Sequence, residues 1–283
     1  MEITATQKMK LPKRRDNALS LFVRLGISSI KQYCHRFLWL MLFSLPVWAA
    51  GDGMQPVNTA RGTHLIVLDA GHTPQQGGAL GARGIYEVAY NDHFTAELAQ
   101  ALQTKGYKVA LTRKPEESIG LNERAAFANR ANADLFLSIH HDSAQLHYLH
   151  KTTVNGKTAY QTIKPIRGYS LFVSQKNPQF RKSLLFAEQI GSQLSFTSNR
   201  KPTLHHAEKI AGENRELLDA KLGIYRFDDL VVLAKTKIPA VLLEVGVIVD
   251  ADDEAYVNNP QHQKTMINAI SNAVDLYFLN SGV

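Results

Sequence analysis

The stretch LFLSIHHD, residues 135–142, decides how the rest of the chain is interpreted. Its first five residues form a short, largely apolar run, which is typical of a strand buried inside a parallel sheet. The run ends at His140, His141 and Asp142, although a buried strand has no structural need for such polar side chains. This ending is either an ordinary exit from the core into a polar loop or the rim of a functional site.

Strand-like and helix-like segments alternate on both sides of this stretch. Four further apolar runs have strand character, namely HLIVLDAGH (64–72), YKVALTR (107–113), GYSLFV (168–173) and IPAVLLEVG (238–246). Residues 85–105 repeat apolar side chains at helical spacing, and Asn259-Pro260 opens a final helix. Strands that alternate with helices predict an α/β fold: a single domain over residues 63–283, with a mostly parallel twisted sheet and helices on both faces.

Two segments interrupt this alternation. Within residues 145–167, the Asn155-Gly156 dipeptide between β-prone flanks predicts a hairpin inserted into the domain. Residues 203–220 are expected to form a helix. Taken by itself, the segment is interpreted as an exposed amphipathic helix.

Residues 1–49 have the composition of a secretory signal peptide. They contain eight of the 32 lysines and arginines but only two of the 25 acidic residues, and they include most of the apolar run FLWLMLFSLPVWAA. This run is shorter than the roughly 20 residues that a spanning helix needs. We therefore expect cleavage after Ala49, a linker over residues 50–62, and export to the periplasm or cell wall. An uncleaved signal anchor is the alternative, and Arg14-Arg15 leaves the twin-arginine route open.

Charge and cysteine content exclude several classes of protein. Beyond the leader, 24 basic residues face 23 acidic ones, so the net charge of +7 gives no support for nucleic-acid binding. The single cysteine, Cys34, lies in the leader. A mature domain without cysteine has no disulfide bond, cysteine nucleophile or thiolate metal ligand, and it must be stabilised by its hydrophobic core.

Unusual polar groups stand at the ends of three apolar runs. His72 follows the first run, His140 ends the second and Glu244 ends the third. Because the carboxyl ends of parallel strands meet at one edge of a sheet, these side chains are expected to converge. Glu87 opens the first long helix and can reach the same crevice. Two imidazoles and one carboxylate form a zinc-ligand set with an open position, and a further carboxylate can act as base.

Each of these residues also has a purely structural interpretation. Glu87 could simply favour the amino end of a helix, and His72 could be an ordinary loop residue. Glu244 is harder to explain in this way, because a nearly buried carboxylate is costly unless it is paired or functional. Spacing alone leaves both interpretations open.

The motifs, taken in order, resemble those of the zinc-dependent N-acetylmuramoyl-L-alanine amidases, which cleave bacterial peptidoglycan. The resemblance rests on IVLDAGH (66–72), RGIYEVAYN (83–91), LTR (111–113), LNERAAFAN (121–129), ADLFLSIHHDSA (133–144) and IPAVLLEVGVIVD (238–250). It implies a fold similar to that of zinc exopeptidases and one Zn²⁺ per chain. The implied zinc ligands are His72, Glu87 and His140, and the implied catalytic residue is Glu244. His141 occupies a position that the family fills with a small or polar residue, so it is expected not to be a ligand.

The resemblance also suggests supporting roles. Asp69 and Asp142 are candidates to accept a hydrogen bond from a metal-bound imidazole. Arg113 and Arg124 occupy recurring family positions and are interpreted as partners in structural ion pairs.

Two features of the family bear on specificity and regulation. Relatives usually carry phenylalanine and asparagine where this chain has Val247 and Asp250, which puts the fine specificity in doubt but not the metal site. In some relatives, a helix between the second histidine and the catalytic glutamate covers the zinc until a partner protein removes it. In this chain the carboxylates that could cap the metal are Glu208, Glu213 and Glu216.

The implied reaction is hydrolysis of the amide between N-acetylmuramic acid and L-alanine, in cell-wall remodelling or daughter-cell separation. The expected partners are peptidoglycan and an activator protein, with no nucleic acid and no stable membrane span after leader cleavage. Two alternatives are a non-catalytic peptidoglycan-binding regulator with the same fold and a zinc peptidase that acts on stem peptides.

Overall fold

The computed structural model describes residues 59–209 and 213–282. The predicted signal peptide and most of the predicted linker lie outside these ranges, and they remain predictions. A 3₁₀ turn, η1 (Thr59–Thr63), leads into the first strand. None of the helices within the described ranges has both the length and the apolar character needed to cross a membrane.

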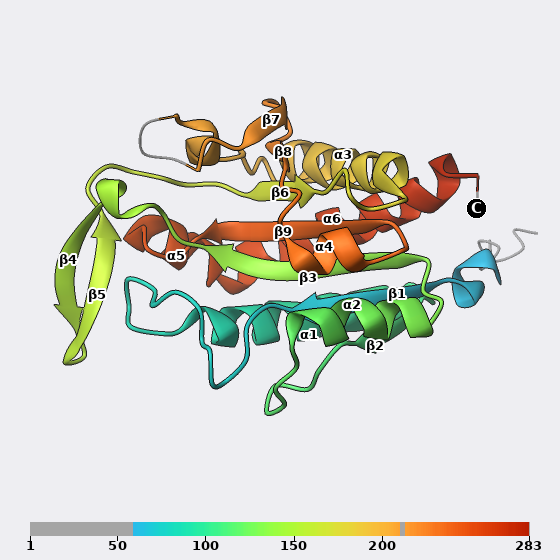
Figure 1. The fold of residues 1–283 in the computed structure, drawn as a ribbon, viewed down its shortest axis with the longest axis horizontal. Helices are drawn as coiled ribbons and strands as arrows, with labels where there is room; N and C mark the ends of the chain where they lie inside the picture. Colours follow the sequence, from blue (N-terminus) through green and yellow to red (C-terminus); the bar gives the residue numbers. More distant parts are fainter. Residues whose placement is uncertain (1–58, 210–212, 283) are drawn as a thin grey trace, which may run out of the picture. The chain divides into compact units, whose positions relative to one another are not determined.

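The stretch LFLSIHHD forms strand β3 (Leu135–Asp142), as predicted, inside a seven-stranded sheet. Its neighbours are β1 (Leu65–Ala70) and β9 (Ala240–Val247), both parallel to it. The other strands are β2 (Lys108–Leu111), β6 (Ser170–Val173), β7 (Glu216–Asp219) and β8 (Ile224–Arg226). The order across the sheet is β2-β1-β3-β9-β6-β8-β7. The carboxyl ends of β1, β3 and β9 therefore meet at one edge (Figure 1).

The sheet is mixed, with a parallel half that carries the predicted site. Strands β2, β1, β3 and β9 all run in the same direction. Strand β6 is antiparallel to β9, β8 is parallel to β6, and β7 is antiparallel to β8. The prediction of a mostly parallel sheet in one domain is confirmed.

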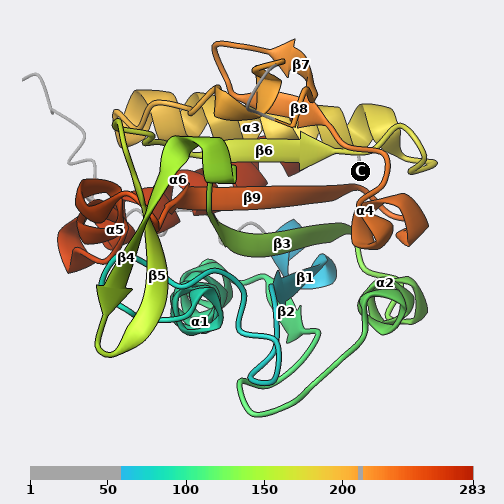
Figure 2. The same ribbon diagram turned by 60° about the vertical axis from the view of Figure 1, so that its left-hand side comes forward.

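Helices cover both faces of the sheet, as predicted. They are α1 (Glu87–Thr104), α2 (Leu121–Arg130), α3 (Phe180–Thr197), α4 (Val231–Lys235), α5 (Ala251–Val257) and α6 (Pro260–Asn280). Helices α1, α3 and α6 pack on one face, and α2 and α4 pack on the other (Figure 2). Leu135, Leu137 and Ile139 of β3 join the first core, whereas Phe136 joins the second. Because β3 is buried on both faces, its sequence is a nearly continuous apolar run.

The predicted hairpin is present and lies outside the main sheet. A 3₁₀ turn, η2 (Leu146–Tyr148), precedes β4 (Leu149–Val154), which pairs antiparallel with β5 (Lys157–Thr162). The turn residues Asn155 and Gly156 have φ angles of 52° and 75°. Positive φ at both central positions is what a two-residue type I′ turn requires, and Asn-Gly meets that requirement.

The helix predicted over residues 203–220 is wrong for the part of that segment that the structure describes. The chain instead forms a 3₁₀ turn, η3 (His205–Ala207), and then the edge strand β7. His205 and His206 are buried, and Leu217 pairs with Tyr225 of β8. Tertiary contacts therefore override the helix-forming composition of this segment.

Candidate metal centre

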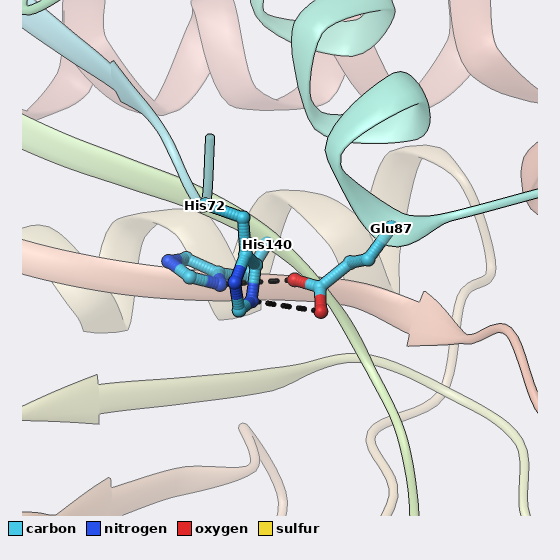
Figure 3. Close-up of side chains that lie close together, drawn as sticks. All are labelled: His72, Glu87 and His140. Carbon is cyan, nitrogen blue, oxygen red and sulfur yellow. Dashed lines mark hydrogen bonds and ion pairs between the residues drawn. The ribbon is translucent and has the colours of Figure 1, made fainter. Parts of the chain in front are cut away.

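Three predicted ligands converge at the carboxyl edge of the sheet. Nε2 of His72 lies 2.9 Å from Oε2 of Glu87, and Nδ1 of His140 lies 3.0 Å from Oε1 of the same carboxylate (Figure 3). One donor atom from each residue lies within 4.8 Å of the others, a spacing that could hold a metal ion. The three side chains come from the loop after β1, from the first residue of α1 and from β3, so only the folded chain brings them together.

The backbone at His72 adopts a conformation that is unfavourable for a non-glycine residue. Its φ angle is 63°, in the left-handed region. Two buried arginines support this turn: Arg113 Nε donates to the carbonyl of His72 at 2.9 Å, and Arg124 Nη2 donates to the same oxygen at 2.6 Å. The ion pairs expected of these arginines are also present, from Arg113 to Asp92 and from Arg124 to Asp69, both at 2.6 Å. The arginines thus fix the strained turn that aims His72 at the site.

Glu87 is held by its own helix as well as by the histidines. Nδ2 of Asn91, one turn further along α1, donates to Glu87 Oε1 at 3.1 Å and to the carbonyl of Gly71 at 3.2 Å. Burial would raise the pKa of Glu87, but hydrogen bonds and charge from His140 and His72 outweigh it and hold the pKa well below its usual value. Glu87 is therefore ionised and oriented. Asn91 was not predicted to be a site residue. Its position four residues after Glu87 on a predicted helix nevertheless indicated that the two side chains could be in contact.

Two glycines leave the space that these ligands occupy. A Cβ atom at Gly71 would lie less than 3.0 Å from the His140 ring, and one at Gly78 would lie less than 3.0 Å from Glu87 and His72. The absence of side chains at both positions lets the imidazoles and the carboxylate approach one another. This cradle fits a small ion bound by nitrogen and oxygen donors.

Replacing Gly71 with alanine should displace the His140 ring and lower metal affinity and activity by about 10- to 100-fold, the scale seen when a group that orients a metal ligand is removed. Gly62→Ala is the matched control, because nothing lies within 4 Å of a Cβ atom at that position. Zinc affinity and hydrolytic rate should be measured on both variants. Equal values for the two would contradict the role given to Gly71.

Glu244 lies beside the three ligands on the neighbouring strand. It is directly paired with His140 in the β3–β9 register. Its Oε2 atom is buried and has no hydrogen-bond partner among the described residues. Burial raises the pKa of the Glu244 carboxyl well above its usual value, and the nearby carboxylates of Asp142 and Glu87 raise it further. A buried carboxylate oxygen without a hydrogen-bond partner among the described residues lowers the stability of the fold. Such groups are often retained because they are functional.

His141 lies outside the cluster of His72, Glu87 and His140. Its Nδ1 lies 2.8 Å from Oδ1 of Asn91, and its ring lies near Tyr90 and Phe94 of α1. Burial lowers the pKa of His141 to about 3, so the imidazole is neutral. It acts as a core residue on the α1 side of the sheet.

The supporting roles predicted for Asp69 and Asp142 differ from what the structure shows. Asp69 accepts hydrogen bonds from Thr112, Ser138 and Arg124, and none among the described residues joins it to His72 or His140. It therefore supports the arginine that holds the His72 turn. Asp142 instead contacts His206, with Oδ2 2.8 Å from Nε2, and His205, with a separation of 3.5 Å.

The three glutamates predicted to cap the metal have other partners in the described structure. Glu208 accepts a hydrogen bond from Tyr148 at 2.5 Å, and Glu216 pairs with Arg226 at 2.6 Å. Glu213 pairs with Arg215 at 2.6 Å, and the neighbouring His206 and Arg215 side chains lower its pKa to about 2. None of the three is bonded to His72 or His140 in the described ranges, so this arrangement does not show a cap over the metal centre.

Val247 and Asp250, which depart from the family pattern, lie in the packing around the hairpin base. Val247 is buried in a small cluster with Ile166. Asp250 caps the start of α5 and accepts hydrogen bonds from Ile166 and Thr162. Neither residue belongs to the cluster of His72, Glu87 and His140.

This edge of the sheet carries two imidazoles, an ionised carboxylate and a second carboxylate, whose Oε2 has no hydrogen-bond partner among the described residues. Such a set of groups is typical of a metal-dependent hydrolase. The sequence model of the N-acetylmuramoyl-L-alanine amidases matches residues 66–275. The chain belongs to this family.

Relatives agree with this assignment. N-acetylmuramoyl-L-alanine amidase AmiA of Salmonella typhimurium is 26% identical over 223 residues, which cover 76% of each protein. A putative N-acetylmuramoyl-L-alanine amidase of Buchnera aphidicola is 24% identical over 76% of this chain and 96% of its own length. The crystal structure of the amidase from Clostridium difficile 630 has a TM-score of 0.58 at 22% identity, covering 77% of this chain and 97% of that one. The chain is thus a cell-wall amidase by family and by fold.

Proposed function

We propose that His72, Glu87 and His140 hold one zinc ion and that Glu244 is the general base in hydrolysis of the amide between N-acetylmuramic acid and L-alanine. The observation that carries this proposal is the convergence of three nitrogen and oxygen donors within 4.8 Å, beside the half-buried Glu244, whose buried Oε2 has no hydrogen-bond partner among the described residues. Zinc accepts such a mixed donor set and keeps a position open for catalysis.

When bound, zinc polarises the scissile carbonyl and lowers the pKa of water from 15.7 towards about 7. Glu244 accepts the proton of the attacking water and then delivers it to the leaving amine of L-alanine. Glu87 contributes a fixed negative charge, and Arg113 and Arg124 keep the His72 turn in place.

Export and a protein partner complete the proposal. Peptidoglycan lies outside the cytoplasm, so the substrate requires the export that the basic, apolar leader predicts. A protein activator is proposed because the similar CwlD amidase from Clostridioides difficile was solved in complex with the GerS lipoprotein, at 19% identity and a TM-score of 0.55.

Digestion of purified peptidoglycan tests the reaction. The zinc-loaded protein should release stem peptides with a free L-alanine amine beside intact N-acetylmuramic acid, and a chelator should stop the release. Mass spectrometry of the fragments distinguishes the alternatives. Cleavage within the stem peptide would show a peptidase, and binding without any new ends would show a regulator.

A further inference from the structure

A second cluster of metal-binding side chains lies outside the proposed catalytic centre. It consists of Asp142 at the end of β3 and of His205 and His206 in η3, all buried. Asp142 Oδ2 lies 2.8 Å from Nε2 of His206 and 3.5 Å from Nε2 of His205. The two imidazoles are adjacent in the chain, their ring centroids are 3.9 Å apart, and both direct Nε2 at one carboxylate oxygen.

The outer nitrogen of each ring faces an oxygen atom. Nδ1 of His205 lies 3.0 Å from Oγ1 of Thr203, within hydrogen-bond distance. Nδ1 of His206 is buried without a hydrogen-bond partner among the described residues, and the nearest carboxylate oxygen, Oε2 of Glu213, lies 3.7 Å away. When a metal is bound through one nitrogen of an imidazole, the other nitrogen usually donates to an oxygen. This arrangement leaves both Nε2 atoms available as ligands.

The distances match a tetrahedral ion. Ligands at 2.0–2.1 Å from a tetrahedral zinc lie about 3.3 Å from one another. The two measured separations, 2.8 and 3.5 Å, lie on either side of that value. A cavity of about 360 Å³ is lined by His205 of the cluster and by Thr203 and Tyr148.

We propose that Asp142, His205 and His206 form a second divalent metal site, separate from the catalytic one and suited to Zn²⁺ or a similar transition metal. Bound metal would tie the segment around η3 to the carboxyl end of β3, two residues beyond His140. The competing arrangement is a metal-free ion pair between Asp142 and a protonated His206.

Metal stoichiometry separates these two arrangements. After saturation with Zn²⁺ and removal of loosely bound ions, the wild-type protein should retain two equivalents by plasma emission spectrometry. His205→Gln and His206→Gln should each retain one. His150→Gln, which changes an exposed histidine on β4, should retain two. Metal retained by folded His206→Gln in the same amount as by the wild type would overturn the second site.

A variant of the first site makes the test independent of how the histidine variants fold and of the proposed function. Glu87→Gln should lose the catalytic metal but still bind one equivalent of Co²⁺, with the visible absorption of a tetrahedral nitrogen and oxygen site. Adding His206→Gln to it should abolish that absorption. Absence of Co²⁺ binding by folded Glu87→Gln would contradict the second site, whereas failure of the amidase proposal would appear only in the products of peptidoglycan digestion.

Discussion

Replacing Glu244 with glutamine should lower the rate of peptidoglycan hydrolysis by about 10²- to 10⁴-fold, the usual contribution of a general acid–base group. Glutamine keeps the shape of the side chain but cannot accept the proton of the attacking water. Because Glu244 is not one of the three clustered ligands, the zinc content should stay at the wild-type value. Release of soluble fragments from dye-labelled peptidoglycan measures the rate, and plasma emission spectrometry measures the zinc.

A comparison of stabilities shows whether any loss of activity arises from unfolding. In the metal-free protein, the raised pKa of Glu244 favours folding at low pH, and this contribution is lost as the pH rises through the raised value. Glu244→Gln removes the buried charge, so its Tm should equal or exceed that of the wild type above neutral pH. The control is Glu216→Gln on the edge strand β7, which should keep full activity. Wild-type turnover by Glu244→Gln would refute the role of this residue.

The convergence of the three site residues at the ends of strands could be predicted from the sequence, because it follows from the parallel direction of these strands. His72, His140 and Glu244 each end an apolar run, and parallel strands bring such ends to one edge. The role of Glu87 was predicted mainly from the family resemblance, because a glutamate at the start of a helix is common for electrostatic reasons alone.

Features that depend on tertiary partners could not be predicted. Strand β6 is antiparallel to β9, but a short strand buried on both faces has the same apolar pattern in either direction. The segment around His205 has helix-forming residues, yet burial of its histidines against Asp142 and the pairing of β7 with β8 determine its structure. The partners of Asp69 and Asp142 likewise come from distant segments, and no spacing within the sequence encodes them.

Replacing Glu87 with glutamine should remove the catalytic zinc and lower the hydrolytic rate by about 10³-fold or more. Metal ions contribute several kcal/mol of transition-state stabilisation, and each 1.36 kcal/mol corresponds to a tenfold change in rate. Glu87 is the only anion among the three clustered donors, and its two oxygens lie 2.9 and 3.0 Å from the two imidazoles. A neutral amide cannot supply that charge, and its NH₂ group would turn a donor towards one of the histidine nitrogens.

Glu97→Gln is the matched control for this change, because Glu97 lies on the same helix but is exposed. It should bind zinc and hydrolyse peptidoglycan like the wild type. Zinc affinity measured by competition with a chelator, together with the rate at saturating zinc, separates weaker binding from a slower reaction. If excess zinc fully restored the rate of Glu87→Gln, the carboxylate would serve only to retain the ion. If the rate stayed below that of the wild type at saturating zinc, the charge of Glu87 and its contacts with His72 and His140 would also contribute to the reaction itself.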